Sequence, residues 1–361
     1  MNRITATLLC LMLCLAGTSL HATAFAAEQT SVSAPTPAPA TRPFPAPVTT
    51  RTVTVPASID ATGSSDVTAA LNAFLATVPD GSIISFPTGA IYLLDTQYAS
   101  FHISNRHNLV FEGNGATLKA GPNASMTSAY ASQFMIGDDS DYPNTDIVVH
   151  AFILIGNSPT PGVFIPGLEQ QKNLHVAYTT RVEIYNITGS AAPADFLMCY
   201  GSNEVWVHDC HALTVGRNGI TVISGSNILV EYNAFDVSGY CTFDIEPDFV
   251  TQPCSDVTIR NNTAGTFGLL FFAVEGSHTG AMIDGIVVDG NTATGGSLKM
   301  LVDNGGTARM TRIAFTDNKG EVAATGPVLQ FMHVDGLTVT GNIQPLSSGA
   351  LTSIADCTGA R

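Results

Sequence analysis

The sequence predicts an all-β protein, a single-stranded parallel β-helix in which short strands stack coil upon coil. Seven segments share one pattern, a short run of alternating β-branched residues that ends in Asn, Asp or a similar residue. They are VEIYNIT from Val182, VWVHDCH from Val205, ILVEYNA from Ile228, VTIRNNT from Val257, IVVDGNT from Ile286, IAFTDNK from Ile313 and LTVTGNI from Leu337. Their starts are 23, 23, 29, 29, 27 and 24 residues apart, and a repeat of this length indicates a solenoid.

The composition of these segments separates a β-helix from other repeat architectures. Their period-2 alternation and their many Gly and Asn residues argue against helical repeats. Leucine-rich repeats need a leucine consensus, which is missing, and a propeller blade needs roughly 40 residues or more. We expect the Asn at the end of each run to lie in a turn, where it tolerates left-handed dihedrals and can hydrogen-bond its equivalent in the next coil.

An amphipathic α-helix is expected at the start of the domain, where it would cap the open end of the solenoid. Ser65 can cap such a helix at its N-terminus, and the helix would run to Val78, before Pro79-Asp80-Gly81. Its apolar face would consist of Val67, Leu71, Phe74, Leu75 and Val78.

Residues 1–26 are predicted to be a signal peptide, with Arg3, a following apolar run and the small-residue cleavage pattern Ala24-Phe25-Ala26. Residues 27–52 are rich in Pro, Ala and Thr and are predicted to form a semi-extended linker. Residues 53–361 are predicted to form the β-helix domain. This organisation predicts a secreted, periplasmic or cell-surface protein without an integral membrane segment.

The chain is acidic, with 29 Asp and Glu residues against 14 Lys and Arg residues and no basic run. Nucleic acids are therefore not expected as partners, because their binding relies on Lys and Arg that neutralise phosphates. The same balance disfavours a strongly anionic substrate, unless a local basic cleft overrides the net charge.

Five cysteines remain after the predicted cleavage. Secretion permits disulfides, and an odd count leaves at least one thiol free. We expect a bridge between Cys241 and Cys254, because it would close a short loop. The five are Cys199, Cys210, Cys241, Cys254 and Cys357.

Three stretches resemble the pectate-lyase-like superfamily of right-handed parallel β-helices. Ile59 to Leu94 is similar to its N-terminal cap and first coil, Asn108 to Ala120 to its second coil, and RNGITVISGSNILVEYNAF from Arg217 to a repeat of secreted β-helix proteins. The resemblance covers about residues 53–345 and implies a right-handed solenoid. It implies no single activity, because the superfamily includes polysaccharide lyases, glycoside hydrolases, epimerases, esterases, phage tailspikes and adhesins.

The stretch CTFDIEPDFVTQPC gathers carboxylates in a chain of which only 12% is charged. Phe243 and Ile245 are expected to face the core. Side chains alternate along a strand, so Asp244 and Glu246 would both face outward, ~6.5–7 Å apart. Glycoside hydrolysis uses two carboxyl groups that flank the scissile bond, ~6.5–9.5 Å apart for inversion. We therefore predict a catalytic pair, with Glu246 as general acid and Asp244 as base.

Two further acids are expected beside this pair. Alignment of strand ends places Glu275 and then Asp303 next to Glu246, at spacings of 29 and 28 residues. Stacked positions lie ~4.8 Å apart, and like charges that close raise a pKa, which is why Glu246 is predicted as the acid. The alternatives are that these acids are solvated strand-end residues or that they bind a cation.

Arg217 and Trp206 are predicted substrate contacts. The planar guanidinium of Arg217 can orient a sugar hydroxyl or carboxylate, and the alternative is a salt bridge to Asp195, Asp244 or another nearby acid. Trp206, the only tryptophan, is expected to face outward as a platform for sugar stacking, or else to pack against a neighbouring loop.

His208 and His211 are candidate acid/base or substrate-binding groups, and the alternative is that one of them satisfies turn hydrogen bonds. The densest acidic run, DDSDYPNTD from Asp138 to Asp146, has the alternating acids that can ligate Ca²⁺. The EF-hand spacing is absent, so a solvated loop is the preferred interpretation. No cofactor and no metal-ligand set is predicted.

The sequence thus predicts a carbohydrate-active enzyme, a glycoside hydrolase that cleaves a polysaccharide with paired carboxylates. One alternative is a polysaccharide lyase or C5-epimerase on a uronic-acid polymer, with Arg217 or a His as base. The other is a non-catalytic glycan-binding or surface protein. Because no subfamily's catalytic set transfers intact, these alternatives stay open, as do the sugar, the linkage and the oligomeric state.

Overall fold

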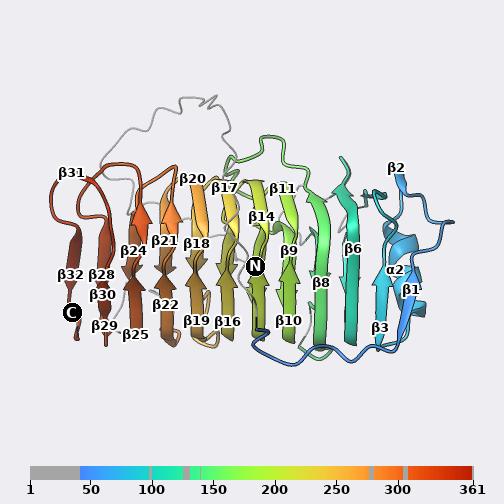
Figure 1. Ribbon diagram of the computed structural model, residues 1–361, viewed down its shortest axis with the longest axis horizontal. Helices are drawn as coiled ribbons and strands as arrows, with labels where there is room; N and C mark the ends of the chain where they lie inside the picture. Colours follow the sequence, from blue (N-terminus) through green and yellow to red (C-terminus); the bar gives the residue numbers. More distant parts are fainter. Residues whose placement is uncertain are drawn as a thin grey trace. The chain divides into compact units, whose positions relative to one another are not determined.

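The computed structural model describes residues 41–96, 100–124, 131–138, 140–275, 280–303 and 308–359. The predicted signal peptide and the first part of the predicted linker lie outside these residues. Most of the parallel strands belong to three ladders, in which strands of successive coils lie side by side (Figure 1). The protein is therefore a single-stranded parallel β-helix, as the repeat predicted. In the described part of the chain, no helix is long and apolar enough to cross a membrane.

The strands β6 (His107–Ala120) and β8 (Asn144–Ile155) are long enough to belong to both ladder 1 and ladder 2. The other strands of ladder 1 are β1 (Arg51–Thr54), β3 (Ser82–Ser85), β10 (Thr179–Tyr185), β13 (Ser202–His208), β16 (Gly225–Glu231), β19 (Cys254–Arg260), β22 (Ile283–Asp289), β25 (Met310–Thr316), β29 (Val334–Asp335) and β30 (Thr338–Thr340). The other strands of ladder 2 are β2 (Thr62–Asp66), β4 (Ile91–Leu94), β11 (Thr188–Ala192), β14 (His211–Val215), β17 (Ala234–Ser238), β20 (Thr263–Phe267), β23 (Thr292–Ala293) and β26 (Lys319–Gly320).

The strands of ladder 3 are β5 (Phe101–Ile103), β7 (Ala131–Ile136), β9 (Gln171–Ala177), β12 (Leu197–Tyr200), β15 (Ile220–Val222), β18 (Cys241–Ile245), β21 (Leu270–Glu275), β24 (Met300–Asp303), β28 (Leu329–Met332) and β32 (Thr352–Ala355). A short separate pair consists of β27 (Ala324–Thr325) and β31 (Leu346–Ser348).

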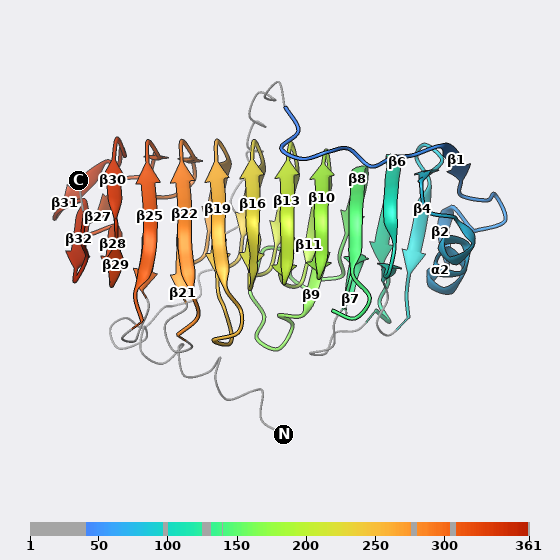
Figure 2. The same ribbon diagram turned by 90° about the horizontal axis from the view of Figure 1, so that it is seen from below.

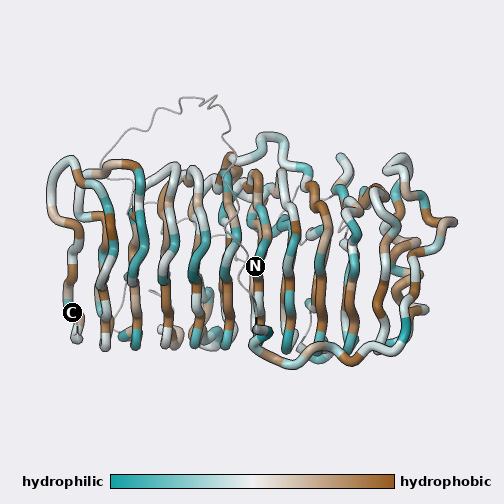
Figure 3. The backbone as a smooth tube through the Cα atoms, viewed as in Figure 1, coloured by the Kyte–Doolittle hydropathy of each residue, from teal (hydrophilic) through white to brown (hydrophobic). Residues whose placement is uncertain are grey.

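The predicted repeats stack in register in ladder 1. Val182 pairs with Val205, which pairs with Ile228, and the same register continues through the later repeats. Alternate residues of each run are buried in one core that runs through the solenoid, and apolar stretches recur coil after coil in Figure 3. In the first coils this core contains phenylalanines packed edge to face, with ring centroids 4.8–5.9 Å apart.

An asparagine ladder follows the turn after the ladder 1 strands. Its members are Asn233, Asn262, Asn291, Asn318 and Asn342. From Asn262 onward, each side-chain oxygen accepts from the backbone amide and the side-chain nitrogen of the Asn one coil earlier, at 2.9–3.0 Å. The oxygen of Asn233 accepts from the Cys210 amide at 2.9 Å. The predicted bonding is confirmed. The predicted left-handed dihedral is present at the terminal Asn186 (φ 52°) and Asp209 (φ 51°) of the first two repeats. In the ladder itself it belongs to the residue before the Asn, as at Tyr232 (φ 55°) and Asn261 (φ 54°).

The predicted helix is present as α2 (Thr68–Thr77), and its Leu71 and Leu75 are buried in the main core. The prediction that Ser65 caps it is wrong. Ser65 lies in β2, where its hydroxyl and its amide donate to Asp60 at 2.7 and 2.9 Å. The serine is therefore engaged in the turn around Asp60 before the helix begins.

Residues 41–50, the last part of the predicted linker, run along the solenoid toward β1 (Figure 2). Arg42 forms an ion pair with Glu183 of β10, and Phe44 is buried. The amide of Val48 donates to the side-chain oxygen of Asn108 at 2.8 Å. This part of the segment is therefore packed against ladder 1 rather than forming a free tether.

The predicted disulfide between Cys241 and Cys254 is absent, because both side chains are free thiols. Cys254 belongs to the main core, with its sulfur 3.5 Å from the carbonyl oxygen of Ile223. Cys241 belongs instead to a small separate cluster with Leu270 and Ala273. Closeness in sequence was a poor guide here, since the two thiols lie in different apolar clusters.

Candidate functional site

The predicted carboxylate pair lies on ladder 3, at the end of β18. Phe243 and Ile245 are fully buried in the main core. Asp244 and Glu246 therefore point to the outer side, as the alternation predicted. The Asp244 side chain is only 5% exposed and that of Glu246 is 25% exposed, so the pair is largely closed to solvent.

The predicted acidic row is also present along this ladder. Glu275 pairs directly with Asp303 in the strand register. Ile245 pairs with Val274, so Glu246 follows in line with Glu275. The sequence thus predicted correctly which coils carry carboxylates at matching heights.

Arg217 lies among these acids rather than in open solvent. Its guanidinium forms an ion pair with Glu246 and lies 3.7 Å from Asp195 and 3.8 Å from Asp244. The Arg217 side chain is only 11% exposed. The salt-bridge alternative describes it better than the predicted substrate contact, because its charge is already neutralised by protein groups.

Two neutral side chains hold the carboxylates around Arg217. Asn218 donates to Asp244 at 2.9 Å, and its backbone amide donates to Asp195 at 3.1 Å. The Thr221 hydroxyl donates to the other oxygen of Asp195 at 3.0 Å. We call Asp195, Arg217, Asp244, Glu246 and the buried Lys172 the Arg217 cluster.

Lys172, Asp195 and Asn218 were not predicted as members of this site. A signal for them exists in the sequence, because Lys172, Asp195, Asn218 and Cys241 follow one another at intervals of 23 residues. That interval is the spacing of two of the recognised repeats, so a search for polar residues at the coil period finds them.

The surroundings of Asp244 shift the electrostatics of the carboxyl group that was predicted as the base. Burial, and next the charge of Glu246, raise the pKa of Asp244 well above its ordinary value. Burial likewise raises the pKa of Asp195. Asp244, predicted as the base, is therefore the carboxyl group that tends to keep its proton.

The two cations of the cluster behave in opposite ways. Burial lowers the pKa of Lys172 to about 8. The pKa of Arg217 is raised well above its ordinary value, because Glu246, Asp195 and Asp244 outweigh the opposing effect of burial. Arg217 is therefore unsuited to act as the base of a lyase or epimerase.

The other predicted substrate contacts do not converge on the pair. Trp206 is on the outer side of ladder 1 but only 2% exposed; its indole nitrogen donates to Glu231 at 2.9 Å and its ring stacks on His208 at 3.8 Å. No ring face is left for a sugar. His208 also contacts Asp209 at 2.7 Å, and His211 belongs to ladder 2.

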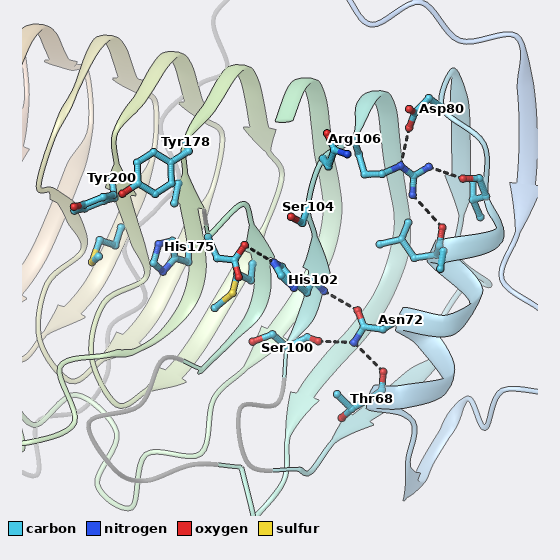
Figure 4. Close-up of a pocket in the computed structure, with 18 of the residues that line it drawn as sticks. Thr68, Asn72, Asp80, Ser100, His102, Ser104, Arg106, His175, Tyr178 and Tyr200 are labelled. Carbon is cyan, nitrogen blue, oxygen red and sulfur yellow. Dashed lines mark hydrogen bonds and ion pairs between the residues drawn. The ribbon is translucent and has the colours of Figure 1, made fainter. Parts of the chain in front are cut away.

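A groove of about 1060 Å³ lies on the outer side of ladder 3, beside α2. Its lining includes His102, Met135, His175 and Met198, which are direct neighbours on β5, β7, β9 and β12. Figure 4 shows α2 at one side, Tyr178 and Tyr200 at the other, and the two histidines between them. No pattern in the sequence predicted this groove.

Asn72 of α2 connects the helix to the groove floor. Its side-chain nitrogen donates to the carbonyl oxygens of Thr68 and Ser100 at 2.9 and 2.8 Å, and its oxygen accepts from the His102 amide at 2.9 Å (Figure 4). The His102 ring lies 3.2 Å from the Asp138 carboxylate. The polar groups of this side are thus fixed by the helix–strand contact.

The opposite side of the groove is aromatic. The rings of Tyr178 and Tyr200 meet edge to face at 5.2 Å, and the Tyr200 hydroxyl accepts from Gln252 at 3.1 Å. Gly201 has a φ of 57°, and a Cβ there would lie 2.9 Å from the Tyr178 ring. A glycine at this position therefore lets Tyr178 rest on the backbone.

The groove and the Arg217 cluster are neighbours on one surface. Met198 pairs with Thr221, and Thr221 pairs with Asp244. The groove lining ends at β12, so one strand, β15, separates it from the carboxylate pair. A ligand that extends from the groove along ladder 3 would reach the cluster after ~10 Å.

A metal site has no support from the described side chains. Among them, no group of three or more His, Cys, Asp or Glu is arranged to hold an ion. In the acidic run from Asp138 to Asp146, the two end residues pair with basic side chains instead of a cation. Asp138 contacts His102, and Asp146 forms an ion pair with Arg181 at 2.6 Å.

Comparison with solved structures gives several matches at low sequence identity. An exopolygalacturonase from Thermotoga maritima matches with a TM-score of 0.54 at 12% identity, over 87% of this chain and 94% of that one. The Streptococcus pneumoniae surface adhesin PfbA matches with a TM-score of 0.53 at 13% identity, over 82% of this chain and 94% of the adhesin chain. The tailspike of E. coli bacteriophage HK620, in complex with a pentasaccharide, matches with a TM-score of 0.53 at 11% identity. This match covers 84% of the present chain but only 64% of the tailspike chain.

No protein-family model and no curated protein sequence matches the chain. The ladder register and these structural neighbours together define its class. The fold is a right-handed parallel β-helix, as the sequence resemblance implied. Hydrolase, adhesin and tailspike share this fold, so the fold selects none of their activities.

Proposed function

We propose that this protein is a secreted or surface-exposed carbohydrate-binding protein that holds a glycan in the ladder 3 groove. The groove itself is the observation that carries the proposal. It combines two methionines and two tyrosines with fixed polar groups, a combination that suits sugars, which present both apolar ring faces and hydroxyl groups. The tailspike neighbour, solved with a pentasaccharide, supports a carbohydrate ligand.

Replacement of Tyr200 by alanine is expected to weaken glycan binding about tenfold, because the variant loses an aromatic contact with the ligand. A glycan array followed by titration calorimetry measures it. The matched control is Tyr185→Ala on ladder 1, whose ring stacks on His150 and His208 outside the groove. Absence of any glycan ligand for the wild type, or an equal loss in the control, would contradict the proposal.

Hydrolysis is a second candidate, favoured by the raised pKa of Asp244. A carboxyl group that keeps its proton beside the more exposed Glu246 meets the requirement for an acid and a base. In this arrangement Asp244 is the acid and Glu246 the base, with Glu275 and Asp303 next to them.

Asp244→Asn and Glu246→Gln are expected to abolish hydrolysis of a polysaccharide while circular dichroism shows an intact fold. Incubation with a panel of polysaccharides, reading reducing ends and ultraviolet absorbance together, detects hydrolysis and elimination separately. Full activity in both variants would exclude the carboxylate mechanism. Binding of a polysaccharide without release of sugar would support the carbohydrate-binding function and exclude hydrolysis.

A further inference from the structure

We infer that the groove selects glycans without acidic groups, either neutral or amino-bearing, and discriminates against uronic-acid polymers. The inference deepens the proposed function and rests on it. It concerns the charge that the groove offers to a ligand, which the shape of the groove does not determine.

Among the described residues that line the groove, Arg106 is the only Lys or Arg, and each of its three side-chain nitrogens donates to a protein oxygen. Its Nε donates to Asp80 at 2.7 Å, one terminal nitrogen donates to the Leu75 carbonyl oxygen at 3.0 Å, and the other donates to that of Val78 (Figure 4). The Asp80 carboxylate cancels its charge. No further guanidinium group is left in the lining to pair with a sugar carboxylate, which is the interaction that Arg suits best.

The two histidines of the groove add no net positive charge. Burial lowers the pKa of His175 to about 3, so its ring is neutral at physiological pH. His102 faces Asp138 at 3.2 Å, so even a protonated ring there forms a neutral pair. The Asp138 side chain is 46% exposed and belongs to the groove lining, so its carboxylate is within reach of a ligand.

Cations elsewhere on ladder 3 do not change this balance. Arg217 is surrounded by three carboxyl groups, and Lys172 is only 1% exposed. Lys299, the exposed lysine before β24, is separated from the last groove strand by β15, β18 and β21. The internal stretches outside the described residues contain no Lys or Arg in the sequence.

A uronic acid therefore brings a charge that the groove would leave unpaired. Placing a carboxylate beside Asp138 without a counterion costs both desolvation and repulsion. A hydroxymethyl group in its place costs neither, and an amino group would gain attraction from Asp138. The net charge of −15 for the whole chain adds to this discrimination, because it repels an approaching polyanion.

The test uses the full chain and tetramers of glucose, galactose and mannose, each compared with the uronic acid and with the amino sugar of the same linkage. In titration calorimetry at low salt, the neutral member that binds is expected to bind at least tenfold more tightly than its uronate. This difference in affinity is expected to become smaller at high salt, because salt screens the interactions between exposed charges. Asp138→Asn should narrow it too, whereas Asp256→Asn, a similarly exposed acid on ladder 1, should leave it unchanged.

The outcomes separate the two proposals. Equal or tighter binding of the uronate overturns the charge selection and leaves the carbohydrate-binding function in place. An undiminished gap in Asp138→Asn also overturns the electrostatic argument. Failure of every neutral, amino-bearing and uronic tetramer to bind overturns the proposed function and the inference with it.

Discussion

Replacement of Arg217 by methionine is expected to lower the free energy of unfolding by about 3–5 kcal/mol, the loss typical when one partner of a buried ion pair is removed. The guanidinium lies among Asp195, Asp244 and Glu246. Without it, these carboxyl groups face one another with little solvent. Urea unfolding, followed by the fluorescence of Trp206, the single tryptophan, measures the change.

The matched control is Arg312→Met. Arg312 also pairs with two acids, Asp256 and Asp284, but its side chain is 61% exposed. Surface pairs contribute only about 0–1 kcal/mol, so this variant should unfold close to the wild type. A loss in Arg217→Met no larger than in the control would contradict the structural role that we assign to the cluster.

The loss of stability in Arg217→Met should depend on pH. In the folded protein the pKa values of Asp195 and Asp244 are raised by burial and lowered by Arg217. Between the unfolded value near 3.9 and the raised value, the folded state binds more protons, so these groups make stability fall as pH rises. Removing Arg217 raises both pKa values further. The deficit of the variant should therefore be smaller at pH 5 than at pH 8, and a deficit independent of pH would contradict this account.

The cluster also shows what a single sequence predicts well. Period-2 alternation determines which side of a strand each residue faces, so the outward direction of Asp244, Glu246 and Trp206 was predictable. The repeat period determines the register, so the row from Glu246 to Asp303 was predictable too. What covers an outward residue is not encoded in either pattern. The sequence therefore left both sugar stacking and packing against neighbouring residues open for Trp206, and the structure shows that the side chain is buried.

The groove escaped prediction for a related reason. Its four neighbouring residues His102, Met135, His175 and Met198 are separated by 33, 40 and 23 residues along the chain. Connections of different length hide the common register, although the strands pair directly. The far side, α2, comes from still earlier in the sequence. Only the folded arrangement brings these residues together.

Replacement of Asn262 by alanine is expected to lower the free energy of unfolding by about 3 kcal/mol, since each buried polar group left without a partner costs about 1–3 kcal/mol. Its oxygen accepts from the Asn233 amide at 2.9 Å, and its nitrogen donates to Asn291 and to the Val230 carbonyl. Asn262 is 1% exposed, so water cannot replace these bonds without opening the turn. Urea unfolding of the purified variant measures the loss.

The control for this prediction is Asn342→Ala, the last member of the same ladder. Asn342 makes closely similar bonds, accepting from the Asn318 amide at 3.0 Å and donating to the Phe315 carbonyl at 2.7 Å, but it is more exposed. Water can replace its bonds, so a loss of about 1 kcal/mol or less is expected. If both variants lost the same stability, burial would not be what makes the ladder stabilising, and the bonds themselves would have to account for it. A loss at Asn262 alone assigns the effect to the dry interior of the turn, where every coil depends on the Asn of the next.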